Sequence, residues 1–220
     1  IQLRGGAESL GAGGARFDGN VSHAVMPPLP WLDPERSFSV ELWVSVVTID
    51  GVAGTGTLLI HHASSLRMRF KIYLTESYQV RVSYRKVNGF THTLRGGTVP
   101  FGVHQVVATF GFDGAWLYVD GKLRDSTSTV IGVNDGVGET YLFADNGDGY
   151  SSITGDLRSL TFFNATIPEE EINARYEEII PLLPAVSGSW NLDNQSTAPT
   201  FLLRGPARCS YEWWNPCIEE

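Results

Sequence analysis

The sequence is poor in cysteine and has no long hydrophobic run. Its 220 residues include only Cys209 and Cys217, and no CxxC pair occurs, which argues against a metal site built on thiolates. The two cysteines enclose CSYEWWNPC, so we interpret residues 205–220 as an extension closed by a small disulfide loop. No apolar stretch approaches the roughly 20 residues of a membrane helix, and we expect no membrane insertion by this segment.

Basic residues are also scarce relative to acidic ones. The chain has 16 Lys and Arg against 24 Asp and Glu, and its net charge of −8 argues against nucleic-acid binding. It starts at Ile1 without a signal peptide, so we expect a processed product or a part of a longer protein with other domains. Sequons at Asn20, Asn164 and Asn194 favour the secretory pathway and an extracellular or cell-surface location, although chance matches without a glycan are the alternative.

The sequence does contain a series of short alternating segments. With 42% hydrophobic residues, 18% charged residues and 24 glycines, the composition is that of a turn-rich globular protein. Residues 38–46 (FSVELWVSV), 66–74 (LRMRFKIYL) and 78–84 (YQVRVSY) each place every second side chain on one apolar face. Shorter strands are predicted at 58–61, 91–94, 105–110, 116–119, 140–143 and 157–163. No βαβ rhythm is present, so the pattern predicts an all-β protein of two packed antiparallel sheets.

Two tight turns and one helix complete the expected elements. Asp113-Gly114 and Asp120-Gly121 predict hairpin turns, because these residue types tolerate positive φ. A helix is predicted over residues 168–178, with Pro168 at its first position and glutamates complementing its N-terminal dipole. We expect the helix to end before Pro181. Its expected buried face consists of Ile172, Tyr176 and Ile180.

Five motifs follow one another in an order that resembles a known family. They are Phe17-Asp18-Gly19, FSVELWV at 38–44, HQVVAT at 104–109, LYVDG at 117–121, and a tail of Gly155-Asp156-Leu157, Asn164 and IPEEEI at 167–172. This order resembles the concanavalin A-like lectin/glucanase jelly roll in its laminin G-like and pentraxin-like branch. The resemblance covers roughly residues 15–180. It implies a two-sheet antiparallel jelly-roll β-sandwich, and we expect a single domain over residues 1–220.

The same resemblance implies a role in recognition rather than catalysis. Domains of this type act as recognition or adhesion modules that bind glycans or extracellular protein partners, and a structural or assembly module without glycan binding is the alternative. Glycoside hydrolysis needs two carboxylates. The glucanase E-x-D-x-(x)-E strand does not occur, and Glu41 has no second acid in its strand. We therefore expect no enzyme, and a polysaccharide-degrading activity is the least favoured interpretation.

A basic stripe is the first candidate binding surface. Alternation predicts that Arg67, Arg69, Lys71, Arg81 and Arg85 lie on the outward face of two paired strands. Arginine offers bidentate contacts to anions, so the stripe suits an anionic glycan or an acidic partner. A solvated sheet face whose charges are offset by neighbouring acids is the alternative.

Aspartates in turns are candidate ligands of a structural Ca²⁺ ion. Asp145 and Asp148 lie in a Gly-rich loop that offers the oxygen ligands calcium prefers. The family resemblance implies a second location, with Asp18 and Asp156 as ligands. At both locations the alternative is that these are only turn residues. Asn20, next to Asp18, cannot easily serve both as a buried ligand and as a glycan carrier.

Overall fold

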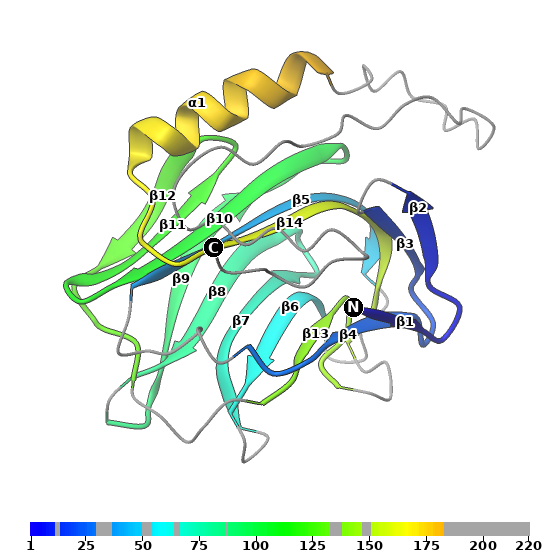
Figure 1. Cartoon of the computed structure of the whole chain (residues 1–220), viewed down its shortest axis with the longest axis horizontal. Coiled ribbons are helices and arrows are strands. Elements are labelled where there is room, and N and C mark those ends of the chain that lie inside the picture. Colours follow the sequence, from blue (N-terminus) through cyan, green and yellow to red (C-terminus); the bar gives the residue numbers. More distant parts are fainter. Residues whose placement is uncertain are drawn as a thin grey trace, which may run out of the picture.

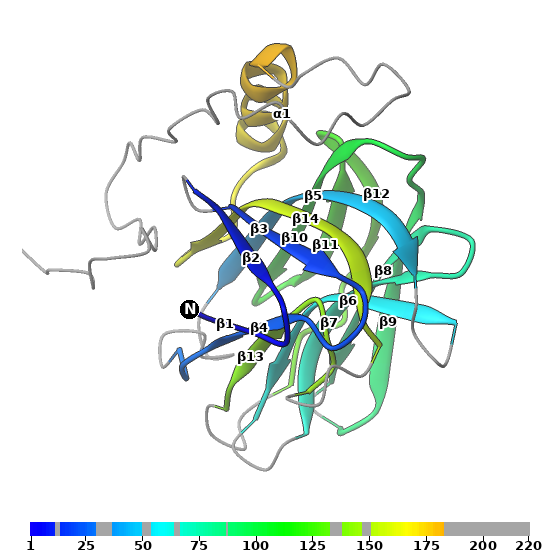
Figure 2. The same cartoon turned by 90° about the vertical axis from the view of Figure 1, so that its right-hand side faces the viewer.

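The computed structural model describes residues 1–11, 14–29, 37–49, 54–63, 67–86, 88–132, 138–146 and 151–182. These residues form two antiparallel seven-stranded sheets that lie face to face as a jelly-roll β-sandwich (Figures 1 and 2). Sheet A has the order β1 (Gln2–Arg4), β4 (His23–Met26), β13 (Thr140–Leu142), β6 (Thr55–His62), β7 (Met68–Thr75), β8 (Gln79–Arg85), β9 (Thr91–Thr98). Sheet B has the order β12 (Lys122–Thr127), β11 (Gly114–Val119), β10 (Val103–Gly111), β5 (Phe38–Ile49), β14 (Ile153–Phe163), β3 (Gly14–Asp18), β2 (Glu8–Gly11).

The hydrophobic core lies between the two sheets. The apolar face expected for residues 38–46 is confirmed, because every second side chain from Phe38 to Val46 is buried in this core. Aromatic rings join the two sheets: Phe17 of β3 stacks on Phe143, which follows β13, at 4.1 Å between ring centroids, and Phe38 of β5 lies 5.5 Å from Phe70 of β7. Such contacts add to the hydrophobic burial that stabilises a sandwich.

Helix α1 (Glu169–Ile179) packs on the outer side of sheet B, away from sheet A (Figures 1 and 2). Its buried residue Ile172 joins a small cluster with Val107 and Tyr118, and Tyr176 stacks on Trp43 with 6.0 Å between ring centroids. The outer face of sheet A carries no helix of the described chain (Figure 2). Within the described ranges, a helix therefore covers the outer face of sheet B and none covers that of sheet A.

The predicted helix is confirmed, but its first and last residues and its buried positions differ from those predicted. Pro168 is the N-cap residue, because its φ of −72° and ψ of 158° are extended rather than helical. The chain continues through Pro181 in a 3₁₀ turn, η1 (Ile180–Leu182). Ile179 takes the buried position that was expected of Ile180, which is 37% exposed. Position i+7 from Ile172 lies closer to the sheet-facing line of a 3.6-residue helix than position i+8.

Both predicted hairpin turns are present, but in one of them the two loop residues differ from the predicted ones. Asp120 and Gly121 have φ values of 53° and 74°, as the predicted tight turn requires. In the other hairpin Gly111 pairs with Gly114, so the two loop residues are Phe112 and Asp113 rather than Asp113 and Gly114.

A β-bulge in β7 overturns part of the predicted alternation. His61 pairs with Phe70 and His62 pairs with Met68, which leaves Arg69 as the extra residue. Beyond the bulge, Met68 packs against an outer cluster with Ile60 and Tyr141 instead of entering the core. Arg69 is only 6% exposed, so the prediction that it lies on the solvated face is wrong. A bulge reverses the facing of every residue on one side of it.

Candidate functional site

The outer face of sheet A brings together side chains from three strands, which we call the sheet A face. It consists of Lys71 and Tyr73 from β7, Arg81 and Ser83 from β8, and Thr93 and Arg95 from β9. The register aligns Lys71, Ser83 and Thr93 in one row, and Tyr73, Arg81 and Arg95 in the next. Side chains directly opposite one another in such rows interact.

Hydroxyl groups occupy the middle of the sheet A face. The Ser83 and Thr93 hydroxyls are 2.7 Å apart and hydrogen-bonded, and the Ser83 hydroxyl lies 3.4 Å from the Tyr73 hydroxyl. The Lys71 ammonium lies 5.2 Å from the centroid of the Tyr73 ring, a cation–π distance. The face therefore combines an aromatic surface, hydroxyl groups and cations.

Arg81 and Arg95 place two positive charges opposite each other in register. Arg81 Nη2 donates to Gln79 Oε1 at 2.7 Å, while its buried Nε has no acceptor within the described part of the chain. Among the described residues no carboxylate forms an ion pair with either guanidinium. Like charges directly opposite on a sheet are destabilising, and an unpaired buried donor adds a further cost. An anion bound between the two guanidiniums would relieve both.

The charge of Lys71, on the same face, is neutralised by a carboxylate of the chain itself. Asp145, which follows β13, accepts from Lys71 Nζ at 2.7 Å and 2.9 Å through its two carboxylate oxygens. The Thr57 hydroxyl also donates to Asp145. Lys71 and Arg81 thus differ, since Lys71 is paired with Asp145 and Arg81 has no carboxylate partner in the part of the chain that the structure describes.

A buried ion pair lies under helix α1, on the far side of the molecule from the sheet A face. Glu41 on β5 is fully buried and accepts from Arg175 Nε at 3.1 Å and from Gln105 Nε2 at 2.7 Å. Burial alone would lower the pKa of Arg175, but the hydrogen bond and the charge of Glu41 outweigh it, and the pKa is raised. Such a pair holds the helix to the sheet, because an uncompensated charge in this place is costly.

Comparison with known proteins was made by sequence and by structure. The sequence model of the Laminin_G_3 family, described as the concanavalin A-like lectin/glucanases superfamily, matches residues 18–173. The chain belongs to this laminin G-like family. A search of curated protein sequences finds no match.

Solved structures share the laminin G-like fold of this chain. The botulinum neurotoxin serotype D ligand-binding domain in complex with N-acetylneuraminic acid has 12% identity and a TM-score of 0.65, covering 80% of this chain and 46% of that one. The serotype G binding domain has 11% identity and a TM-score of 0.60, covering 78% and 44%. Trypanosoma rangeli sialidase has 16% identity and a TM-score of 0.63, covering 78% and 28%. These likenesses show the fold, and this chain spans less than half of each of those proteins.

The predicted basic stripe is only partly assembled in this laminin G-like sandwich. Arg67 is exposed just before β7, and Arg81 lies on the sheet A face as expected. Arg69 is buried at the bulge, Lys71 is paired with Asp145, and Arg85 Nε donates to the Gly89 carbonyl at 3.3 Å. The two strands therefore do not present five equivalent cations.

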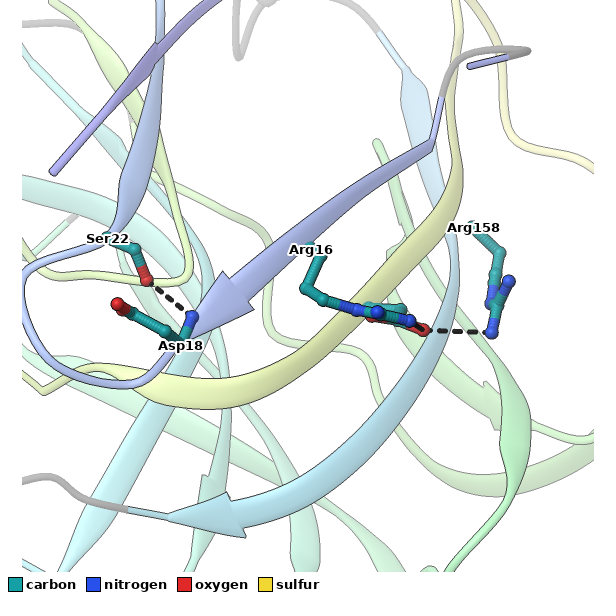
Figure 3. Close-up of polar contacts among 5 residues, drawn as sticks. Arg16, Asp18, Ser22 and Arg158 are labelled. Carbon is teal, nitrogen blue, oxygen red and sulfur yellow. Dashed lines mark hydrogen bonds and ion pairs between the residues drawn. The ribbon is translucent and has the colours of Figure 1, made fainter. Parts of the chain in front are cut away.

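The two aspartates expected to share a calcium ion are directed differently (Figure 3). Asp156 lies between two guanidiniums, with Arg16 Nε at 2.9 Å and Arg158 Nη2 at 2.8 Å. The Asp18 carboxylate points away from that cluster (Figure 3). It accepts a hydrogen bond from the Asn20 amide at 3.1 Å. Hydrogen bonding from Ser22 and from the Asn20 amide lowers the pKa of Asp18. Two arginines on one carboxylate disfavour a cation there.

The remaining predicted site residues are distributed over the described and the other parts of the chain. Asp145 serves as the partner of Lys71, and no three His, Cys, Asp or Glu side chains in the described ranges lie close enough together to share a metal ion. The sequon residues Asn20 and Asn164 are exposed. Four predicted residues lie outside the described residues: Asp148, Asn194, Cys209 and Cys217. The described helix α1 is too short and too polar to span a membrane.

Sequence reasoning missed Arg95 and the partner of Glu41. Arg95 lies beyond the predicted strand 91–94, whose true extent to Thr98 is concealed by Gly96-Gly97. Arg175 lies on the same helix face as Ile172 and Ile179, and a charge on that face was the available signal for a buried acid beneath it.

Proposed function

We propose that the chain is a carbohydrate-binding module that recognises an anionic sugar on the sheet A face. The observation that carries this proposal is the in-register pair Arg81 and Arg95, whose charges have no carboxylate partner among the described residues. A carboxylate or sulfate group can accept hydrogen bonds from both guanidiniums. Tyr73 beside them offers an apolar ring surface, and the half-buried Thr93, whose hydroxyl is hydrogen-bonded to the buried Ser83, offers a hydroxyl group for a sugar hydroxyl.

Similarity of fold supports the same class of ligand. A structural neighbour, the botulinum neurotoxin serotype D domain, is in complex with N-acetylneuraminic acid, a sugar that carries a carboxylate. A rigid sandwich with a sheet face that no helix of the described chain covers suits such recognition. The exposed sequon residues Asn20 and Asn164 support a secreted or cell-surface setting for this module.

The proposed role includes no catalytic step. A glycosidase needs a pair of carboxylates that reach the substrate. Glu41 does not meet this need, because it is buried under helix α1 in an ion pair with Arg175. We expect no release of reducing ends from a polysaccharide panel, and reproducible release that an inactivated control lacks would contradict this part of the proposal.

Binding is tested with a charge-matched pair of double variants. Arg81→Gln/Arg95→Gln removes the two cations of the sheet A face. Lys122→Gln/Arg124→Gln removes two exposed cations from edge strand β12 and serves as the control. On an array of acidic and neutral oligosaccharides, the first variant should bind acidic sugars at least about tenfold more weakly, because charge-assisted hydrogen bonds are lost. The control should bind like the wild-type protein.

The alternative of an assembly module is favoured by exposed phenylalanines at loop positions. Phe90 and Phe112 are each 70% exposed, and Phe101 is 69% exposed. Exposed aromatic groups of this kind suit protein contacts. An array without any bound sugar would overturn the carbohydrate proposal and favour this alternative.

A further inference from the structure

Asp145 is held by its contacts at the edge of the proposed sugar-binding surface. Its carboxylate lies within 2.7 Å of Lys71 Nζ and also accepts from Thr57. The side chain of Asp145 is 26% exposed and that of Lys71 is 14% exposed, so the pair borders on solvent. Lys71 and Arg81 are diagonal neighbours on the sheet face, on the order of 7 Å apart.

The chain around Asp145 is firmly anchored on one side. Phe143 is fully buried, stacks on Phe17, and donates its amide to the Leu58 carbonyl at 3.1 Å. It adopts a φ of 60°, a conformation that a bulky residue takes only when its surroundings impose it. His62 Nε2 lies 3.0 Å from the Asp145 carbonyl. Because the backbone is fixed, displacing the carboxylate needs a side-chain rotation rather than a loop movement.

We propose that Asp145 is an internal competitor that occupies the anion position on Lys71. It places a carboxylate where an acidic sugar on the sheet A face would place its own. Lys71 becomes available only when Asp145 turns away, so Asp145 sets how strongly negative a ligand must be to engage this corner. This inference rests on the proposed function, since it concerns the regulation of the same surface.

The size of the effect follows from competition. A ligand that binds only the open state loses affinity by the factor by which the closed state exceeds the open one. For a partly exposed ion pair this factor is about three to five, given the modest free energy of such pairs. Asn in place of Asp145 keeps the shape and still accepts from Thr57, but it no longer neutralises Lys71.

The test measures anion binding at Lys71 without any sugar. Sodium sulfate is titrated at constant ionic strength, and the Lys71 side-chain NMR signals report binding in each variant. We expect Asp145→Asn to bind sulfate about three- to fivefold more tightly than the wild-type protein. Thr57→Val removes one contact to Asp145 and should give a smaller gain in the same direction. Asp113→Asn changes the same charge at an exposed hairpin residue and is the control.

Each outcome separates the inference from the proposed function. Equal sulfate affinity in Asp145→Asn and the wild-type protein overturns the competitor role, as does an equal gain in Asp113→Asn or no Lys71 response in any variant. Thermal unfolding of every variant checks that the sandwich is intact. A blank sugar array together with the expected sulfate gain would overturn the proposed function alone. Sugar binding that depends on Arg81 and Arg95 without the sulfate gain would overturn only the competitor.

Discussion

At the scale of single residues, His61 is a fully buried titratable group of sheet A. Its ring is fully buried, 5.5 Å from the Phe70 ring between centroids, and its Nδ1 lies 2.8 Å from the Thr140 hydroxyl. Its Nε2 has no partner among the described residues. Burial, with help from the charges of Arg69 and His62, lowers the pKa of His61 to about 3. The folded protein therefore keeps this ring neutral.

The buried ring predicts a loss of stability in acid. Between pH about 6.5 and about 3 the unfolded chain protonates His61 and the folded chain does not, so the free energy of unfolding falls as pH falls. His61→Gln should reduce that slope by up to about one proton, as measured by urea unfolding across this range. His92→Gln, at a partly exposed position on β9, is the control. Identical slopes for His61→Gln and the wild-type protein would refute the prediction.

His104 has the opposite effect on the pH dependence of stability, both in the wild-type protein and in the His61→Gln variant. Burial lowers its pKa, but hydrogen bonding and charge from Asp120, 2.9 Å away, outweigh burial and raise it. Its stabilisation is present at low pH and is lost as pH rises through the raised pKa. Because it is common to wild-type and variant, it cancels in the difference between their slopes.

At the scale of elements, tight turns decide how close the helix comes to the sheet. Gly121 has a φ of 74°, and a Cβ built on it would lie 2.9 Å from Asn173 Oδ1 and 3.2 Å from Tyr176 on helix α1. Gly97 has a similar φ of 81° with nothing within 4 Å. The two glycines therefore share a backbone requirement and differ in their contact with the helix.

This difference can be measured with alanine at each position. Gly97→Ala should cost about 1 kcal/mol, because only the left-handed backbone is strained. Gly121→Ala should cost about 2 kcal/mol or more, because its methyl group also displaces the helix. Urea unfolding gives both free energies. Equal losses of unfolding free energy in the two variants would mean that helix α1 moves aside at the turn without a measurable cost.

Sequence alternation predicted strands well and their faces less well. The runs from Phe38 to Val46 and from Phe70 to Leu74 were correct, since the first pairs with β10 and the second with β8 without a register shift. Arg69 and Met68 were wrong, because the bulge arises from the pairing of β6 with β7 and leaves no mark in the sequence of β7 alone. The same reason explains why only half of the arginine pair was predicted. Arg81 was predicted from alternation, but the position of Arg95 opposite it depends on the register between β8 and β9.

At the scale of the whole molecule, contacts join residues that are distant along the chain. Arg16 reaches Asp156 and Glu41 reaches Arg175 across more than half of the chain length. The order of motifs predicted the family, because a topology fixes the order of its strands and turns along the chain. The motifs could not predict such pairs, because the distances between elements are set only when both sheets have formed.

The sandwich as a whole should fold without residues 183–220. The strands of both sheets and helix α1 are formed by residues 2–179, and the match to the family model covers residues 18–173. We expect a chain ending at Leu182 to unfold in one cooperative transition, with Tm within about 4 °C of the full chain, equivalent to about 1 kcal/mol. Differential scanning calorimetry of both proteins measures this. Loss of the cooperative transition would contradict this expectation and would show that residues 183–220 are needed for the fold.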